Sequence, residues 1–168
     1  MHPNTTVLSL DTGHQRDYGE GVAYRDYFAS DDLYFRVPHV DKRLKNKTEV
    51  LTLRVRPRAG GAPQPLAIEA AFLRRNPVFH FEVEGRRLLA VTSPRGANRV
   101  YDLGDRGVAM QSTPADGVVT DAGGGRWRVT EEALVLETDP TAKLPRVVAV
   151  RAFWFGWFAQ FPTTLLIK

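Results

Sequence analysis

Beyond residue 49 the chain is a succession of short apolar runs separated by glycine and proline, and this spacing restricts the folds open to it. Residues 50–56 alternate apolar with polar side chains, which is the period of a strand with one buried face. Runs on either side of Gly85 predict a hairpin, and further strand-like runs follow, the last at residues 147–150. Many short strands at close spacing predict a mainly β domain, borderline α+β, built as a single β-sandwich or a partly open barrel.

Two short helices are predicted among these strands. Residues 66–74 place apolar side chains at helical spacing, and Pro77 ends the helix. The second helix covers residues 153–161, and its apolar face contains Trp154, Trp157, Phe158 and Phe161. We expect this helix to close the core rather than to leave an exposed face for a partner or a membrane. We therefore expect Trp154 and Trp157 to be structural residues, and we expect the same of Trp127.

Residues 11–47 differ from the rest of the chain because they are polar, rich in Asp, Tyr and Gly, and without sustained periodicity. Six aromatic side chains between residues 18 and 35 argue against disorder, and we expect them to pack against a neighbour. The chain is therefore predicted to have two parts. Residues 1–48 are the loop-rich tail of a preceding repeat plus a linker, and residues 49–168 are a β-rich repeat domain closed by the aromatic helix.

The two ends of the chain carry a similar phrase. Residues 2–8 read His-Pro-Asn-Thr-Thr-Val-Leu, and residues 161–166 read Phe-Pro-Thr-Thr-Leu-Leu. Each is typical of a turn that leads into a short strand. The repetition predicts an internal repeat, and we expect Met1 to lie within what was once a longer, two-part protein.

Composition excludes several kinds of site. The chain contains no cysteine, so disulfides, thiolate nucleophiles and cysteine-ligated metals are excluded. Its net charge is +4, but the cations are scattered apart from four between residues 42 and 47, where no aromatic side chain could stack on a base. We therefore predict no nucleic-acid partner. The longest apolar stretch, residues 147–161, is too short to span a bilayer. From residues 1–5 we expect no signal peptide, and the compartment stays open.

The polar loop near the N-terminus holds the candidate ligand-binding residues, which are Asp11, His14, Arg16, Asp17 and Tyr18. Such a loop can bind a polar ligand or hydrogen-bond to the next domain, and we favour the second role. His14 could share a cation with the two aspartates, but no pair of histidines has metal-ligating spacing. Neither a metal nor a cofactor is predicted, and no catalytic residue can be assigned.

Asp11 also begins an Asp-Thr-Gly sequence that follows apolar residues, a pattern found in aspartic proteases. That chemistry needs two carboxylates that share one proton, and the chain contains one such sequence, so a homodimer would be required. A turn after a strand explains the same residues. The protease is therefore the weaker alternative.

Several of these motifs together resemble the domain of unknown function 3179 family. The resemblance is carried by residues 2–9, 11–13 and 16–19, by Pro38, Asp41, Arg43, Leu44 and Lys47, and by Trp154, Phe155, Trp157, Pro162 and Thr164. It implies that this chain is the C-terminal half of a duplicated protein, whose first half would carry a Cys-Pro-Leu-Cys sequence. It also implies bacterial or archaeal relatives that are often exported or envelope-associated. The chain departs from the family phrase at Asn4, usually Asp, and at Phe161, usually His.

We therefore predict a non-enzymatic structural or binding module, in which residues 11–47 fasten one half of a duplicated protein to the other. Its expected partner is the missing N-terminal half or a second copy of the chain. The alternative is a metal- or ligand-binding enzyme with a site around Asp11, Arg16 and Asp17.

Overall fold

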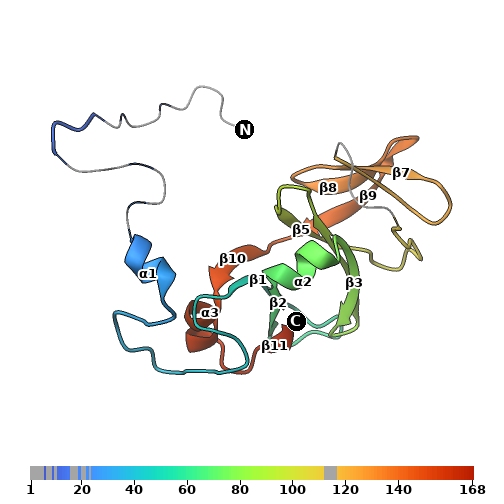
Figure 1. Ribbon diagram of the computed structural model, residues 1–168. Helices are drawn as coiled ribbons and strands as arrows, with labels where there is room; N and C mark the ends of the chain where they lie inside the picture. The colour runs from blue at the N-terminus through green and yellow to red at the C-terminus, as the bar shows by residue number, and fades with distance from the viewer. Residues whose placement is uncertain are drawn as a thin grey trace. The chain divides into compact units, whose positions relative to one another are not determined.

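The computed structural model describes Thr6, Ser9, residues 11–15, Gly19, Val22, residues 24–111 and residues 117–168 (Figure 1). The chain divides into two compact units, residues 1–36 and residues 37–168. The expected boundary after residue 48 stays a prediction. Apart from Thr6, the phrase at residues 2–8 lies outside the described residues, so the internal repeat also stays a prediction.

The first unit contains one short helix, α1 (Arg25–Ala29), among its described residues. The ring of Tyr27 makes edge contacts with Phe28 and Tyr34, at centroid distances of 5.6 and 4.7 Å. Edge-to-face pairs at these distances are among the favoured arrangements of aromatic rings.

The second unit contains two β-sheets. The first has four strands in the order β10 (Val150–Phe153), β1 (Glu49–Val55), β2 (Gln64–Glu69) and β11 (Leu165–Ile167). The second has seven strands in the order β3 (Val78–Val83), β4 (Arg86–Thr92), β5 (Asn98–Asp102), β9 (Asp139–Val147), β8 (Ala133–Leu136), β7 (Arg126–Val129) and β6 (Val118–Thr120). Neighbouring strands are antiparallel, except that β11 runs parallel to β2. The prediction of a mainly β, sandwich-like fold is confirmed, and neither sheet closes into a barrel in the described part of the chain.

Strand β4 is buried on both faces, because it lies between two apolar clusters. Leu88 and Ala90 belong to the cluster between the two sheets, which also contains Leu51 and Leu66 from the four-stranded sheet. Leu89 and Val91 belong to a second cluster on the other face of β4. Apolar side chains from the segment between β5 and β9 make up the rest of this cluster. A strand with two buried faces reads as a continuous apolar run, and residues 88–91 are Leu-Leu-Ala-Val.

Helix α3 (Trp154–Gln160) covers the outer face of the four-stranded sheet and lies beside β1 and β10 (Figure 1). Trp154 and Phe158 pack there with Val50 of β1 and Ala67 of β2 in a third cluster, and Trp154 is 0% exposed. The predicted helix at this place is confirmed, and its apolar side faces the sheet. None of the described helices is long and apolar enough to cross a bilayer.

The helix predicted at residues 66–74 is wrong in its first half. Residues up to Glu69 belong to β2, and α2 covers only Ala70–Arg75. Leu66 and Ile68 face the cluster between the sheets while Ala67 faces the α3 side, so this run is buried between β1 and β11. Apolar residues in a short run fit the period of a helix as well as that of a strand. Pairing with the two neighbouring strands made this run a strand. With α1 included, the described residues contain three short helices instead of the two predicted.

The buried strand predicted at residues 147–150 is also wrong. Val148 is 85% exposed and Val150 is 60% exposed, because this point joins β9 of one sheet to β10 of the other. Strand β9 was not predicted at all, since its two prolines, Pro140 and Pro145, disfavour a strand assignment. Among the further strand-like runs of the sequence, residues 108–111 contain only an isolated bridge between Met110 and Asp121.

A loop of three glycines before β7 is held by Asp121. Its carboxylate accepts hydrogen bonds from the Trp127 indole N–H at 2.8 Å, and from the backbone N–H groups of Gly123 at 2.9 Å and Gly125 at 2.8 Å. The indole hydrogen bond, followed by those from the glycines, lowers the pKa of Asp121. Trp127 is 2% exposed in the second apolar cluster, so this carboxylate connects the glycine loop to the core.

Replacing Gly125 with alanine should destabilise the protein by about 1–3 kcal/mol, because hydrogen bonds to the Asp121 carboxylate would break. A Cβ atom at Gly125 would lie 2.5 Å from Asp121 Oδ2. Denaturant unfolding measures the effect. Gly107→Ala is the control, since a Cβ atom there meets nothing within 4 Å. Equal midpoints for the two variants would contradict the proposed role of Asp121.

Candidate functional site

The candidate residues of the N-terminal loop are only partly described. Asp11 and His14 are exposed. The Asp11 carboxylate accepts a hydrogen bond from the Gly13 N–H at 3.3 Å, a local turn of the kind that aspartate commonly forms. Arg16, Asp17 and Tyr18 lie outside the described residues, so a shared site in this loop stays a prediction. Among the residues that are described, no group of three His, Asp or Glu side chains could hold a metal ion.

Two motifs that lie more than a hundred residues apart in the sequence meet at helix α3. We call the segment of residues 41–48 that contacts this helix the α3 clasp. The backbone N–H of Trp154 donates to the Thr48 carbonyl, and that of Phe155 to the Asn46 carbonyl, both at 2.9 Å. The indole N–H of Trp154 donates to the Asp41 carbonyl at 3.2 Å. The clasp thus supplies acceptors to the first turn of a helix that has no side-chain cap.

Arg43 is the centre of the α3 clasp. Its guanidinium lies 5.2 Å from the ring centroid of Trp154 and 5.5 Å from that of Phe158, within cation–π range. It also donates to Asp41 Oδ1 at 2.9 Å. Partial burial alone would raise the pKa of Asp41, but hydrogen bonds from Arg43 and its charge hold that pKa below its ordinary value. At the other end of the helix the Trp157 indole N–H donates to Thr164 Oγ1 at 2.7 Å.

An arginine-rich hollow lies where β1, β4 and β5 end. This arginine pocket has a volume of 290 Å³, and its lining includes Arg56, Arg58, Arg86, Arg87, Asp102 and Gly104. The turn between β3 and β4 forms one side of it. Glu84 and Gly85 of this turn have φ angles of 54° and 69°, as a two-residue hairpin requires, and the Glu84 carbonyl accepts the Arg58 backbone N–H at 3.1 Å.

The arginines of this pocket differ in how they are paired. Arg86 forms an ion pair with Asp102, whose other oxygen accepts the Gly104 N–H at 2.8 Å. Arg87 donates to the Gly104 carbonyl at 2.8 Å and to the Arg106 carbonyl at 3.2 Å, which holds the loop after β5. These two arginines therefore have structural bonds of their own.

The other two arginines are more available to a ligand. Arg58 donates to Asp105 at 2.5 Å in an ion pair whose side chains are 58% and 81% exposed. For Arg56, which is exposed, the described part of the chain provides no hydrogen-bonding or ion-pair partner. The pocket thus carries more positive charge than its own aspartates neutralise.

A second, more apolar pocket of 330 Å³ lies on the other side of Arg87, lined in part by His80, Leu88, Leu103 and Val108. His80 Nε2 accepts the backbone N–H of Met110 at 3.1 Å, so the other ring nitrogen carries the proton. Removal of the ring from water lowers the pKa of His80, although the residue as a whole is exposed. Burial and this hydrogen bond both favour the neutral ring, which connects β3 to the loop after β5.

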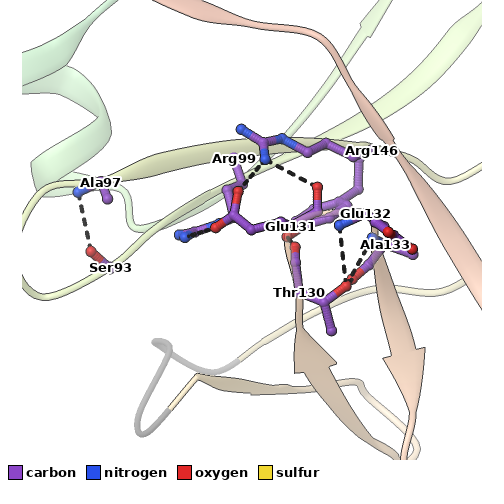
Figure 2. A network of polar contacts seen from close by, with 9 residues as sticks. Ser93, Ala97, Arg99, Thr130, Glu131, Glu132, Ala133 and Arg146 are labelled. Atoms are coloured by element: carbon purple, nitrogen blue, oxygen red, sulfur yellow. Dashed lines mark hydrogen bonds and ion pairs between the residues drawn. The ribbon is translucent and has the colours of Figure 1, made fainter. Parts of the chain in front are cut away.

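A third polar group braces the seven-stranded sheet, with Glu131 between Arg99 of β5 and Arg146 of β9 (Figure 2). The adjacent Thr130 carbonyl accepts the Tyr101 hydroxyl at 2.9 Å, and burial raises the pKa of Tyr101 to about 12. Hydrogen bonds from Arg99 and Arg146 lower the pKa of Glu131. These contacts fasten the turn between β7 and β8 to the middle of the sheet.

Sequence reasoning missed the arginine pocket because its cations come in two pairs separated by about 30 residues, which look scattered along the chain. The available signal was local. Arg86 and Arg87 follow the predicted hairpin turn at Gly85, and Arg56 ends the predicted strand at residues 50–56. Both pairs thus stand at strand ends, but the sequence does not show that these ends meet.

Replacing Arg43 with glutamine should lower the free energy of unfolding by about 1–3 kcal/mol, since the cation–π contacts and the hydrogen bond to Asp41 are lost. Thermal or urea unfolding, followed by tryptophan fluorescence, measures the change. The neighbouring exposed Lys42→Gln variant removes the same charge and is the control. An Arg43→Gln variant as stable as this control would show that the clasp contributes nothing.

The stability of the protein should fall as the pH falls below the ordinary His80 pKa of 6.5. In this range the unfolded chain takes up a proton that the folded chain resists, because His80 has a lowered pKa and accepts a hydrogen bond. His80→Gln keeps an acceptor but cannot titrate. Urea unfolding of both proteins between about pH 5 and 7.5 should show a steeper fall for the parent chain. Parallel curves would contradict this.

Comparison with protein-family models gives a match. A model of a family described as "Protein of unknown function (DUF3179)" matches residues 1–164. No curated protein and no solved structure matches the chain. Because the match begins at residue 1 and covers nearly the whole chain, the expectation that the resemblance is to the C-terminal half only is not borne out. The predicted family is confirmed, and the chain belongs to the DUF3179 family.

Proposed function

We propose that this chain is a non-enzymatic binding module. The observation that supports this best is that the motif residues have structural contacts; these residues are Asp41, Arg43, Trp154, Trp157 and Thr164. Each makes a hydrogen bond or ring contact within the α3 clasp or with helix α3. Residues that carry a family resemblance therefore serve to hold the fold together.

The arginine pocket supports binding as the second part of this proposal. It is formed by strand ends and by a hairpin turn on a framework of two sheets, and rigid elements hold binding groups more accurately than free loops do. Four of its five charged side chains are guanidinium groups, which bind anions and do not act as bases because they stay protonated, and the fifth, Asp102, is paired with Arg86. The chemistry of this pocket therefore favours recognition over proton transfer.

We also propose that the chain derives from a duplicated protein and binds an upstream half or a second copy of itself. The similar phrases at residues 2–8 and 161–166 support this. The contacts of residues 41–48 with helix α3 lie within the second unit and secure that helix, so the proposed fastening of two halves rests on the repeated phrase.

The competing proposal is an enzyme or metal protein with a site around Asp11, His14, Arg16 and Asp17. Purified chain analysed by mass spectrometry for metals should contain no stoichiometric metal, and peptide substrates should not be cleaved in a way that Asp11→Asn abolishes. His14→Ala should leave the melting temperature unchanged, as should the control His39→Ala, since both histidines are exposed. Stoichiometric metal that is lost in His14→Ala and kept in His39→Ala would overturn the non-enzymatic proposal in favour of a metal site.

A further inference from the structure

We propose that the arginine pocket binds a small oxyanion, a ligand that carries phosphate or several carboxylates, and that this ligand takes the place of Asp105 at Arg58. The inference rests on the proposed function as a binding module and names the chemistry of its ligand. It depends on the charge of the pocket, on the pairing of each arginine and on the size of the hollow.

The charge of the pocket is the first step. Four arginines line it against the single aspartate Asp102, and Asp105 adds a second carboxylate at its edge. Guanidinium groups gathered in one hollow repel one another, and an anion between them removes that repulsion. The side chain of Glu84, in the neighbouring turn, does not line the pocket. The uncompensated charge therefore favours a ligand with more than one negative charge.

The pairing of the arginines shows which of them a ligand would contact. Arg86 and Arg87 are engaged with Asp102 and with backbone carbonyls of the loop after β5, bonds that join strands and hold that loop. Arg56 has donors that no described residue uses, and Arg58 uses a terminal nitrogen for Asp105. The planar donor fork of arginine matches the oxygens of carboxylate and phosphate. Arg56 and Arg58 are thus the expected contact residues.

Asp105 shows what kind of group Arg58 binds. The hydrogen bond and the charge of Arg58 lower the pKa of Asp105, so its carboxylate is ionised at neutral pH. Both side chains of the pair are largely exposed, and exposed ion pairs contribute little to stability. A ligand with a higher charge density can therefore displace this internal carboxylate at small cost. Asp105 would compete with the ligand for Arg58 and so weaken the binding of the ligand.

The volume of 290 Å³ limits the size of the ligand. It lies at the lower end of the range for small-molecule sites, which suits a compact anion such as pyrophosphate or a tricarboxylate. A polymer would need a groove that continues along the surface, with several successive contacts.

Isothermal titration of the full chain with pyrophosphate, and separately with citrate, at constant ionic strength tests the proposal. At least one of the two should bind with a stoichiometry of one. Arg56→Gln and Arg58→Gln should each weaken binding by about tenfold or more, since each removes a charged donor. Asp105→Asn should strengthen binding by about threefold to tenfold, because the internal competitor is lost. A tighter fit of pyrophosphate would identify a phosphate ligand, and a tighter fit of citrate a carboxylate ligand.

Arg95→Gln is the matched control, because Arg95 is exposed in the turn at the far end of β4 and its substitution removes the same charge. It should change the affinity by less than about twofold, as expected for a charge screened by salt. Unfolding curves for all four variants check that the fold is intact. Absence of binding to both anions, an equal loss in Arg95→Gln, or an unchanged affinity in Asp105→Asn would each overturn the inference. The non-enzymatic proposal is tested separately by the metal and cleavage measurements and could survive any of these results.

Discussion

Burial of strands on both faces is the constraint on which the rest of the structure depends. Strand β4 separates two apolar clusters, and β1 separates the cluster between the sheets from the one under α3. The clusters are therefore stacked in layers, and each sheet needs an apolar cover on each side. With no cysteine to cross-link it, the chain relies on this burial for its stability. The strands from β5 to β9 complete the cover on one side, and helix α3 provides it on the other.

The need to cover the four-stranded sheet explains why the α3 clasp exists. Helix α3 is only seven residues long and contains Gly156, so it would not be stable by itself. Packing of Trp154 and Phe158 supplies the burial, and carbonyls of residues 46–48 satisfy the N–H groups at its start. The clasp thus supplies hydrogen-bond acceptors to N–H groups that would be left without partners when the helix packs on the sheet. Motif residues that could have marked a reaction centre are in this way part of the fold.

Local patterns predicted those elements whose environment differs between their two sides or whose turn has a specific residue. The hairpin at Gly85 and helix α3 are of this kind, whereas the strand at residues 50–56 was predicted with one buried face and is buried on both. Local patterns failed where neighbours decide, as at Leu66 to Ile68, which are apolar in either period but pair with β1 and β11. They failed again at β9, where Pro145 stands opposite Ala133 of β8 although a proline has no N–H to donate. Of the candidate site loop, the sequence supplied residue types but no geometry.

By itself, the sequence determined that the chain is mainly β, that it contains no cysteine chemistry, that an aromatic helix lies near its end, and which family it resembles. The first three follow from composition and from periods of a few residues, which act locally, and the resemblance rests on short motifs. The tertiary structure decided that residues 41–48 meet Trp154 and that Arg56 and Arg58 share a pocket with Arg86 and Arg87. Such encounters depend on the order and register of strands in two sheets. Strand order is set by the total apolar area that the layers bury, and no single segment of the chain contains that information.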